Sequence, residues 1–317
     1  MTSGVQQLIA TPLRGWNLGE VELRPGVCVE RASSLSGFDI QFFPSLSEHE
    51  LERIRKREYW LTLVTDEPQN EAQCEAAQDH LLRCVEALQI VRPNGWDGIV
   101  VTNRLGEAKA NGLTQFPSCE PTKWGRIVGF GTHQIDYIQS IVVSVERVYD
   151  EKIVRFQTPI QLLIEGLKSR HYFVSFLLWC VALDSLLIAE RRDVFERRII
   201  RFLGADSFVF PLGERGYQPP YKVGQLASDL YELRGFIAHG YEVPRKFREN
   251  IRFEMQDTVY PSGSVQWDYQ YRQLLSDAAL FLLCAVLRRI FELDLIELVK
   301  KSKRWKNHLD TLSPAAP

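Results

Sequence analysis

One eighteen-residue apolar run constrains the fold more than any other feature of the sequence. It covers residues 172–189, YFVSFLLWCVALDSLLIA, and contains a single charged residue, Asp184. A run of this length is a candidate membrane span, but a carboxylate inside a span costs roughly 2.5–3.5 kcal/mol. Basic residues flank the run on both sides and give no orientation signal. We therefore predict a buried helix at the centre of a helical bundle or a dimer interface, and no contact with a membrane.

Length and charge indicate a protein with two parts. A chain of 317 residues is long enough for two hydrophobic cores. Residues 1–150 carry 14 basic against 20 acidic side chains, a net charge of −6, whereas residues 151–317 carry 24 against 20, a net of +4. A polyanionic partner would therefore prefer the second part.

Cysteine usage and the N-terminal sequence indicate a cytoplasmic protein. The six cysteines are scattered, with no C-x-x-C pair and no histidine at zinc-finger spacing, so we expect neither a metal site nor a cofactor. Cysteines inside apolar runs suit a reducing compartment. The first residues lack a basic segment followed by an apolar one, so no signal peptide is predicted.

Hydrophobic periodicity predicts a mainly α protein: a C-terminal helical bundle over residues 135–317, preceded by an α or α+β region over 1–134. Loops and short strands are expected in the first 45 residues, and a long irregular segment with strands at 98–102 and 126–130. Between Gly240 and Trp267 a short hairpin is expected around PSGS. Helices are expected at 47–64, 71–90, 135–149, 159–189 with a break near 168–171, 192–203, 223–238 and 270–300.

The segment 231–240, YELRGFIAHG, is the most informative for function. It ends a predicted helix whose apolar stripe consists of Leu226, Leu230, Leu233 and Ile237. At about 100° per residue, Arg234 lies at the border of this stripe, and Gly240 is well placed to terminate the helix after His239. Gly235 costs the helix about 1 kcal/mol relative to alanine, which suggests close approach of another backbone or a ligand.

An arginine and a histidine near one helix terminus suit phosphodiester chemistry. A guanidinium can hold a phosphate through two hydrogen bonds and neutralise charge in the transition state. An imidazole can accept or donate a proton at neutral pH. RNA supplies its own nucleophile, the 2′-hydroxyl, so no metal is required. The alternative is structural: Arg234 pairs with a helix carboxylate, and His239 caps the last carbonyls.

The order of helices around this pair resembles the HEPN superfamily, most closely its Apea-like branch. The resemblance covers residues 155–295 and rests on four segments, which are LRGFIAHG, ALDSLL, ERRDVFERRIIRFLG and FLLCAVLRRIF. The superfamily motif is an Arg and a His with four to six residues between them, which Arg234 and His239 match with four between. Asp184 fits a supporting position, in which it would orient Arg234 across the bundle; the alternative is that it pairs with another arginine or caps a backbone group. Tyr231 is a further supporting candidate. The sequence departs from the family at Gly235, where a polar residue is common.

The resemblance implies a helical bundle that dimerises so that two motifs share one cleft, with a metal-independent endoribonuclease activity in phage defence or as a toxin. In this hypothesis His239 is the general acid and base, and Arg234 binds the scissile phosphate. RNA and a second copy of the chain are the expected partners. A regulatory ligand or protein is expected at the N-terminal region. The alternative is a non-catalytic helical scaffold that binds a protein or a nucleotide.

Two basic segments are candidates for binding the RNA backbone. Arg197, Arg198 and Arg201 lie on the predicted helix 192–203, and the segment 299–308, VKKSKRWKNH, interleaves Trp305 with basic side chains. Such side chains can follow phosphates while an aromatic ring stacks on a base. Solvated helix faces are the alternative for both.

Overall fold

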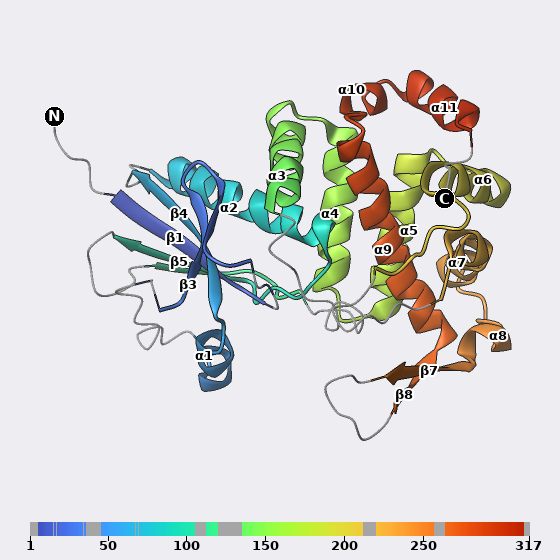
Figure 1. The fold of residues 1–317 in the computed structure, drawn as a ribbon, viewed down its shortest axis with the longest axis horizontal. Helices are drawn as coiled ribbons and strands as arrows, with labels where there is room; N and C mark the ends of the chain where they lie inside the picture. The colour runs from blue at the N-terminus through green and yellow to red at the C-terminus, as the bar shows by residue number, and fades with distance from the viewer. Residues whose placement is uncertain are drawn as a thin grey trace. The chain divides into compact units, whose positions relative to one another are not determined.

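The computed structural model describes residues 6–14, 16, 18–33, 35, 46–66, 68, 70–104, 112–119, 135–211, 220–256 and 264–313. The chain divides into two compact units. Unit 1 contains the first six strands, α1, most of α2, and α3 up to Glu146. Unit 2 contains Ile90–Pro93 and the chain from Arg147 onward. The boundary between the two units therefore lies within α3 (Figure 1).

Unit 1 is built on a six-stranded antiparallel sheet of order β2-β3-β4-β1-β5-β6. The strands are β1 (Gln6–Leu13), β2 (Val21–Arg24), β3 (Val27–Arg31), β4 (Tyr59–Asp66), β5 (Ile99–Arg104) and β6 (Gly112–Gln115). The central pair β1 and β4 runs in register from Gln6 opposite Asp66 to Leu13 opposite Tyr59. Three helices accompany the sheet: α1 (Glu48–Arg55), α2 (Glu71–Val91) and α3 (Ile135–Asp150).

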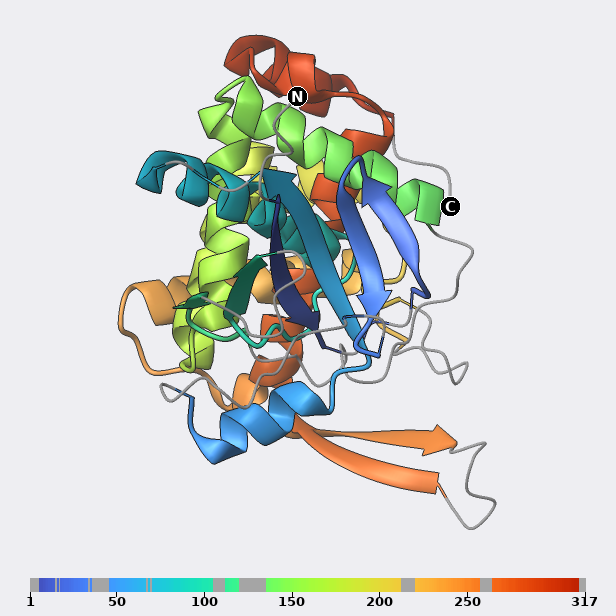
Figure 2. The same cartoon turned by 90° about the vertical axis from the view of Figure 1, so that its left-hand side faces the viewer.

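Both faces of this sheet are buried. Ala10, Trp60 and Val101 share one face and form a core cluster with Ile54 of α1. Side chains alternate along a strand, so the equally buried Leu61 faces the other side. Figure 2 shows α2 and α3 lying behind the sheet. An apolar residue on either face is therefore removed from water, which explains why β1 and β4 lack a clean polar alternation.

The expected mainly α class is wrong for the chain as a whole. Unit 1 is an α+β unit organised around its six-stranded sheet, and the structure carries a second, two-stranded sheet in unit 2. The strands pair residues that lie far apart in sequence, such as Leu13 and Tyr59. A periodicity read along a short window contains no information on such pairing.

The expected helix 47–64 is also wrong beyond its first half. The predicted capping box is present, since Ser47 Oγ accepts a hydrogen bond from Glu50 N and the Glu50 carboxylate accepts one from Ser47 N. The helix α1 ends at Arg55, however, and strand β4 begins at Tyr59. The residues YWLTLV are aromatic or β-branched in four of six positions, which favours a strand over a continued helix.

Unit 2 is helical apart from one hairpin. Its longer helices are α4 (Val154–Lys168), α5 (Tyr172–Leu187), α6 (Arg192–Leu203), α7 (Val223–Ala238), α9 (Tyr271–Glu292) and α11 (Ser302–Thr311). Two single-turn helices accompany them, α8 (Arg245–Arg248) and α10 (Ile296–Val299), together with the hairpin β7 (Asn250–Gln256) and β8 (Ser264–Gln270). Figure 1 shows α4, α5 and α9 running side by side, with α6 and α7 beyond α5.

Most expected helices of this unit are confirmed, including the break between α4 and α5. The expected helix 270–300 is wrong in its last part, because α9 ends at Glu292. Asp294 adopts a left-handed conformation with φ 47°, and Leu295 N donates to Ile290 O, a helix ending that glycine or asparagine more often provides. The expected hairpin is present as β7 and β8. The strand expected at 126–130 lies outside the described residues.

The central helix α5 is buried against α4 by a close contact at Gly166. A Cβ atom built on Gly166 would lie 2.2 Å from Trp179 Nε1, and the same indole nitrogen donates a hydrogen bond to Leu163 O at 3.2 Å. The absence of a side chain at Gly166 therefore lets the Trp179 ring lie against α4. Within the described part of the chain, no single helix is long and apolar enough to cross a membrane. Helices α5 and α6 meet the two criteria only when they are taken together, and this pair is bent by 75°.

We predict that Gly166→Ala destabilises the protein although alanine is the better helix former. The new methyl group must displace the Trp179 indole, and overpacking of this kind costs about 1–3 kcal/mol, against about 1 kcal/mol gained in helix propensity. The measurement is the free energy of unfolding in urea. Gly235→Ala is the matched control, since no described atom lies within 4 Å of its added Cβ; it should stabilise. Equal gains in both variants would contradict the packing argument.

Candidate active site

Helix α7 carries Arg234 and is fixed on two sides. Its buried residues Leu226, Leu230 and Leu233 recur at helical spacing, as the sequence predicts, whereas Ile237 is only half-buried. On another side Asp229 accepts hydrogen bonds from Lys246 Nζ at 2.9 Å and from the Tyr271 hydroxyl at 2.8 Å. These contacts hold α7 against α8 and the start of α9.

Helix α7 ends as the sequence predicts, at Gly240. Gly240 has φ 66°, the left-handed conformation that glycine adopts without strain. Tyr241 N donates to Phe236 O at 2.9 Å and Gly240 N donates to Ile237 O at 3.2 Å, which together form a Schellman motif. The motif fixes His239 as the last residue before the chain turns away from the helix axis.

Arg234 forms an ion pair with Asp184 of α5. Arg234 Nη2 lies 2.7 Å from Asp184 Oδ2, and the two side chains are 28% and 14% exposed. The guanidinium carbon also lies 5.1 Å from the centre of the Tyr231 ring, within the range of a cation–π interaction. The Tyr231 hydroxyl in turn donates to Glu190 O at 3.3 Å. The structure thus brings together three of the predicted site residues.

The protonation of Asp184 is shifted by its surroundings. Burial raises the pKa of the Asp184 carboxyl from 3.8 to about 6, and the adjacent Arg234 guanidinium opposes this rise. The net rise in the pKa of Asp184 means that the effect of desolvation is larger than that of the ion pair with Arg234. The carboxylate is charged above pH 6 and then holds the guanidinium in place.

His239 is exposed and does not touch Arg234. Its ring lies 5.7 Å from the Tyr241 ring, and no hydrogen bond or ion pair within the described residues holds it. Five residues at about 100° each place the two side chains about 140° apart around the helix axis. Gly235 is open as well, so nothing in the described part of one chain supplies the close approach that the sequence predicts. One copy of α7 therefore presents the two groups in different directions.

A strip of α5 beside this ion pair is apolar and open to solvent. Val174 and Val181 are each 47% exposed, and Leu177, Leu178 and Ile188 are half-buried. The positions within the helix recur three or four residues apart, so they share one face of α5 with Asp184, and Ile188 directly follows the helix. We call the face of residues 174, 177, 178 and 181 the α5 strip. It contrasts with the opposite face of α5, which is fully buried.

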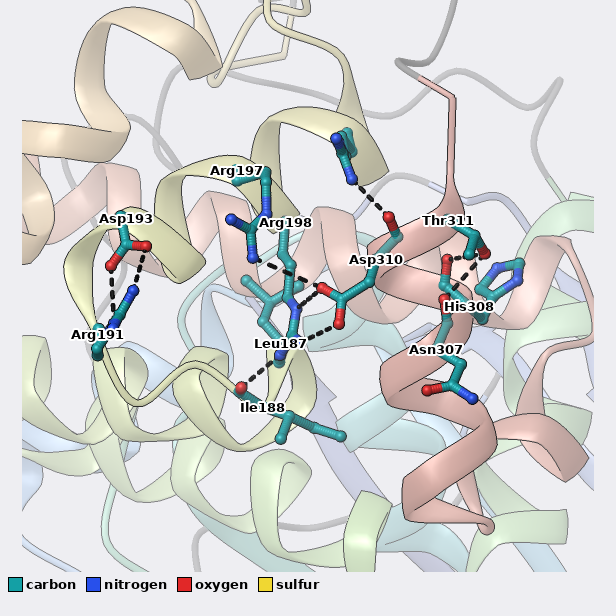
Figure 3. A network of polar contacts seen from close by, with 11 residues as sticks. Leu187, Ile188, Arg191, Asp193, Arg197, Arg198, Asn307, His308, Asp310 and Thr311 are labelled. Atoms are coloured by element: carbon teal, nitrogen blue, oxygen red, sulfur yellow. Dashed lines mark hydrogen bonds and ion pairs between the residues drawn. The ribbon is translucent and has the colours of Figure 1, made fainter.

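The arginines predicted to bind RNA are divided between structural and open positions (Figure 3). Arg198 is 2% exposed, and its Nε and Nη2 donate to Asp310 Oδ1 and Oδ2 at 2.9 and 2.8 Å. Its Nη1 donates to Leu187 O at 2.9 Å. Arg201 donates to Asp310 O at 2.6 Å. Arg197 is 44% exposed and lies 3.7 Å from Asp310. Of the three, only Arg197 presents a largely free guanidinium.

Sequence reasoning missed Asp310 and misplaced Trp305. Trp305 is fully buried and donates its indole N–H to Leu186 O at 2.6 Å, so the expectation that it stacks on a base is wrong. Asp310 follows the buried Leu309 on α11 and accepts hydrogen bonds from both Arg198 and Arg201. A lone acidic residue near the end of a basic helix is the one local signal for this role.

No family model, curated protein or solved structure matches this chain. The described residues contain no group of three or more histidine, cysteine or acidic side chains arranged to hold a metal ion. The chemical interpretation of the site therefore rests on Arg234, His239, Asp184 and the surfaces around them.

We predict that Asp184→Asn stabilises the protein at neutral pH. A carboxyl whose pKa rises from 3.8 to about 6 on folding binds its proton more tightly in the folded state. The free energy of unfolding therefore decreases as the pH increases across this range. Above pH 6 the cost reaches up to about 3 kcal/mol, which the neutral amide avoids. Urea denaturation at pH 4 and pH 8 measures the difference. A loss of stability at pH 8 would show that the ion pair outweighs burial.

Proposed function

We propose that this chain is a metal-independent endoribonuclease that acts as a homodimer through unit 2. The observation that carries the proposal is the Asp184–Arg234 ion pair, which lies beside the open apolar strip of α5 and one helical turn before an exposed histidine. The resemblance of residues 155–295 to HEPN proteins supports the same assignment.

Arg234 is the phosphate-binding group in this proposal. A guanidinium has five N–H donors, and the ion pair with Asp184 is formed through Nη2. The remaining donors can hold two phosphate oxygens and offset the charge that develops in the transition state. Asp184 and the Tyr231 ring restrict the guanidinium, which lowers the entropy lost on binding.

His239 is the acid–base group, and a second copy completes the site. Arg234 and His239 lie about 140° apart around the axis of α7, so one copy of this helix does not direct both groups at the same phosphate. A two-fold axis at the α5 strip would bring a second α7 alongside the first. Burial of the strip would stabilise the dimer by about 25 cal/mol per Å² of apolar surface.

The reaction follows from these roles. One histidine removes the proton from the 2′-hydroxyl, whose oxygen attacks the adjacent phosphorus and forms a 2′,3′-cyclic phosphate. The P–O5′ bond breaks, and the second histidine protonates the leaving 5′-oxygen. Arg234 stabilises the pentacoordinate phosphorus between these steps. Cleavage of cellular RNA would suit a toxin or a phage-defence protein, with unit 1 as the regulatory part.

We predict that His239→Ala lowers RNA cleavage by about 10²–10⁴-fold, because a general acid–base group contributes this much. The measurement is cleavage of a single-stranded RNA in excess EDTA, with identification of a cyclic phosphate end. His171→Ala is the matched control, an exposed histidine of the same unit, and should leave the rate unchanged. Equal cleavage by wild type and His239→Ala would reject the site. Loss of wild-type cleavage in EDTA would reject the metal-free mechanism, and no cleavage at all would favour the non-catalytic scaffold.

We predict that Val181→Glu separates the dimer and abolishes cleavage together. A carboxylate in the centre of the α5 strip would be buried without a partner in the dimer, at a cost of several kcal/mol. Val154→Glu is the control, since Val154 of α4 is 66% exposed and lies off the strip. Analytical ultracentrifugation gives the oligomeric state, and RNA cleavage gives the activity. A monomeric variant with full activity would contradict the shared site.

A further inference from the structure

A cavity lined mostly by charged side chains lies in unit 2 between the α5–α6 turn, α6 and α11. It has a volume of about 280 Å³, close to the lower end of small-molecule sites. Four basic side chains line it, which are Arg191, Arg197, Arg198 and Lys306. Two acidic residues, Glu190 and Asp310, line it as well. The lining therefore carries a formal excess of two positive charges.

Of the two acidic residues, Asp310 is already neutralised, whereas Glu190 is exposed and forms no ion pair with the described residues. Asp310 receives a two-point ion pair from Arg198, and its neighbouring cations keep the pKa of the Asp310 carboxyl below its usual value. Two further N–H groups of Arg198 donate to the carbonyl oxygens of Leu187 and Ile188. These bonds engage four of its five N–H donors, and the side chain is buried, so its main role here is to compensate Asp310.

The other cations of the cavity are open. Arg197 is 44% exposed and its ion pair with Asp310 is long, at 3.7 Å. Lys306 is exposed, and no hydrogen bond or ion pair to the described residues occupies its ammonium group. Arg191 pairs with Asp193, but both side chains are more than half exposed, and such surface pairs contribute little. All three can turn toward an anion at low cost.

The backbone of the cavity wall is strained at Ile188. This residue has φ 49° and ψ 49°, a left-handed conformation that costs a β-branched residue roughly 1–2 kcal/mol. The conformation is that of a helix ending, in which Ala189 N donates to Asp184 O at 3.0 Å. The bond from Arg198 to the Ile188 carbonyl oxygen adds a further restraint on this part of the cavity wall.

We propose that this cavity binds a phosphate group, which Arg197 and Lys306 contact directly, while Arg198 compensates Asp310 and fixes the wall at Ile188. The inference goes beyond the proposed nuclease and stands even if Arg234 and His239 cleave nothing. Two ligands share this chemistry: a backbone phosphate of single-stranded RNA, and a free nucleotide. The RNA source is geometrically reasonable because Asp184 lies in the last turn of α5 and Ile188 directly follows that helix.

The test compares Arg197→Gln with Lys306→Gln, singly and together, against Lys303→Gln, an exposed lysine of the same helix that does not line the cavity. All variants carry His239→Ala so that binding is measured without cleavage. Thermal unfolding reports binding of pyrophosphate and of a nucleoside monophosphate. Fluorescence anisotropy reports binding of a labelled twelve-nucleotide RNA, and its salt dependence counts phosphate contacts.

Pyrophosphate should raise the unfolding temperature of the parent protein and of Lys303→Gln, and the double variant should lose this shift. A tenfold or greater loss of RNA affinity in the double variant, with a salt slope smaller by about 1, identifies the RNA backbone as the source. Unchanged RNA affinity with lost nucleotide binding identifies a free nucleotide. The proposal is overturned if pyrophosphate, nucleotide and RNA bind the double variant as they bind Lys303→Gln. RNA cleavage by the protein that retains His239, measured in a separate assay, tests only the nuclease proposal.

Discussion

The structure of unit 2 depends on how the apolar helix α5 is covered. Its buried face packs on α4 and α9, closely enough that Trp179 leaves no room for a side chain at Gly166. Its polar groups then need partners of their own, because a carboxylate or a carbonyl oxygen without one is costly away from water. Two arginines supply them. Arg234 reaches Asp184 from α7, and Arg198 reaches the last carbonyls of α5 from α6.

This arrangement explains why both candidate sites lie at the same end of α5. The helix has to end in a tight turn before α6, and the turn needs a cation to bind its carbonyls. Arg198 is that cation, and it requires Asp310 of α11 as a counter-ion. A cluster of charges assembled to terminate one apolar helix thereby leaves further cations, Arg197 and Lys306, around a cavity. A structural requirement and a binding surface use the same elements.

The parts of the fold that depend on local sequence were predictable, and the parts that depend on distant pairing were not. The caps at Ser47 and Gly240 follow from two or three neighbouring residues, and the structure has both. Strand β4 pairs with β1, whose residues lie about fifty positions away, and YWLTLV alone does not reveal that partner. In the site, helical spacing placed Arg234 at the edge of a buried stripe, and the lone charge of the apolar helix made Asp184 a candidate partner; the ion pair between them is present in the fold. Asp310 was missed because its partner Arg198 lies 112 positions earlier.

The direction of the side chains at the end of α7 bears on how any chemistry there can work. Arg234 is directed inward to α5 and is restrained, while His239 is the capping residue of the Schellman motif and is exposed. A catalytic pair needs both groups on one phosphate, and rotating either toward the other would break the ion pair or unwind the helix end. A second copy that packs on the α5 strip requires neither change. In the proposed nuclease, the same geometry that keeps a single chain from assembling the site would make cleavage depend on dimerisation and would confine the activity to the assembled protein.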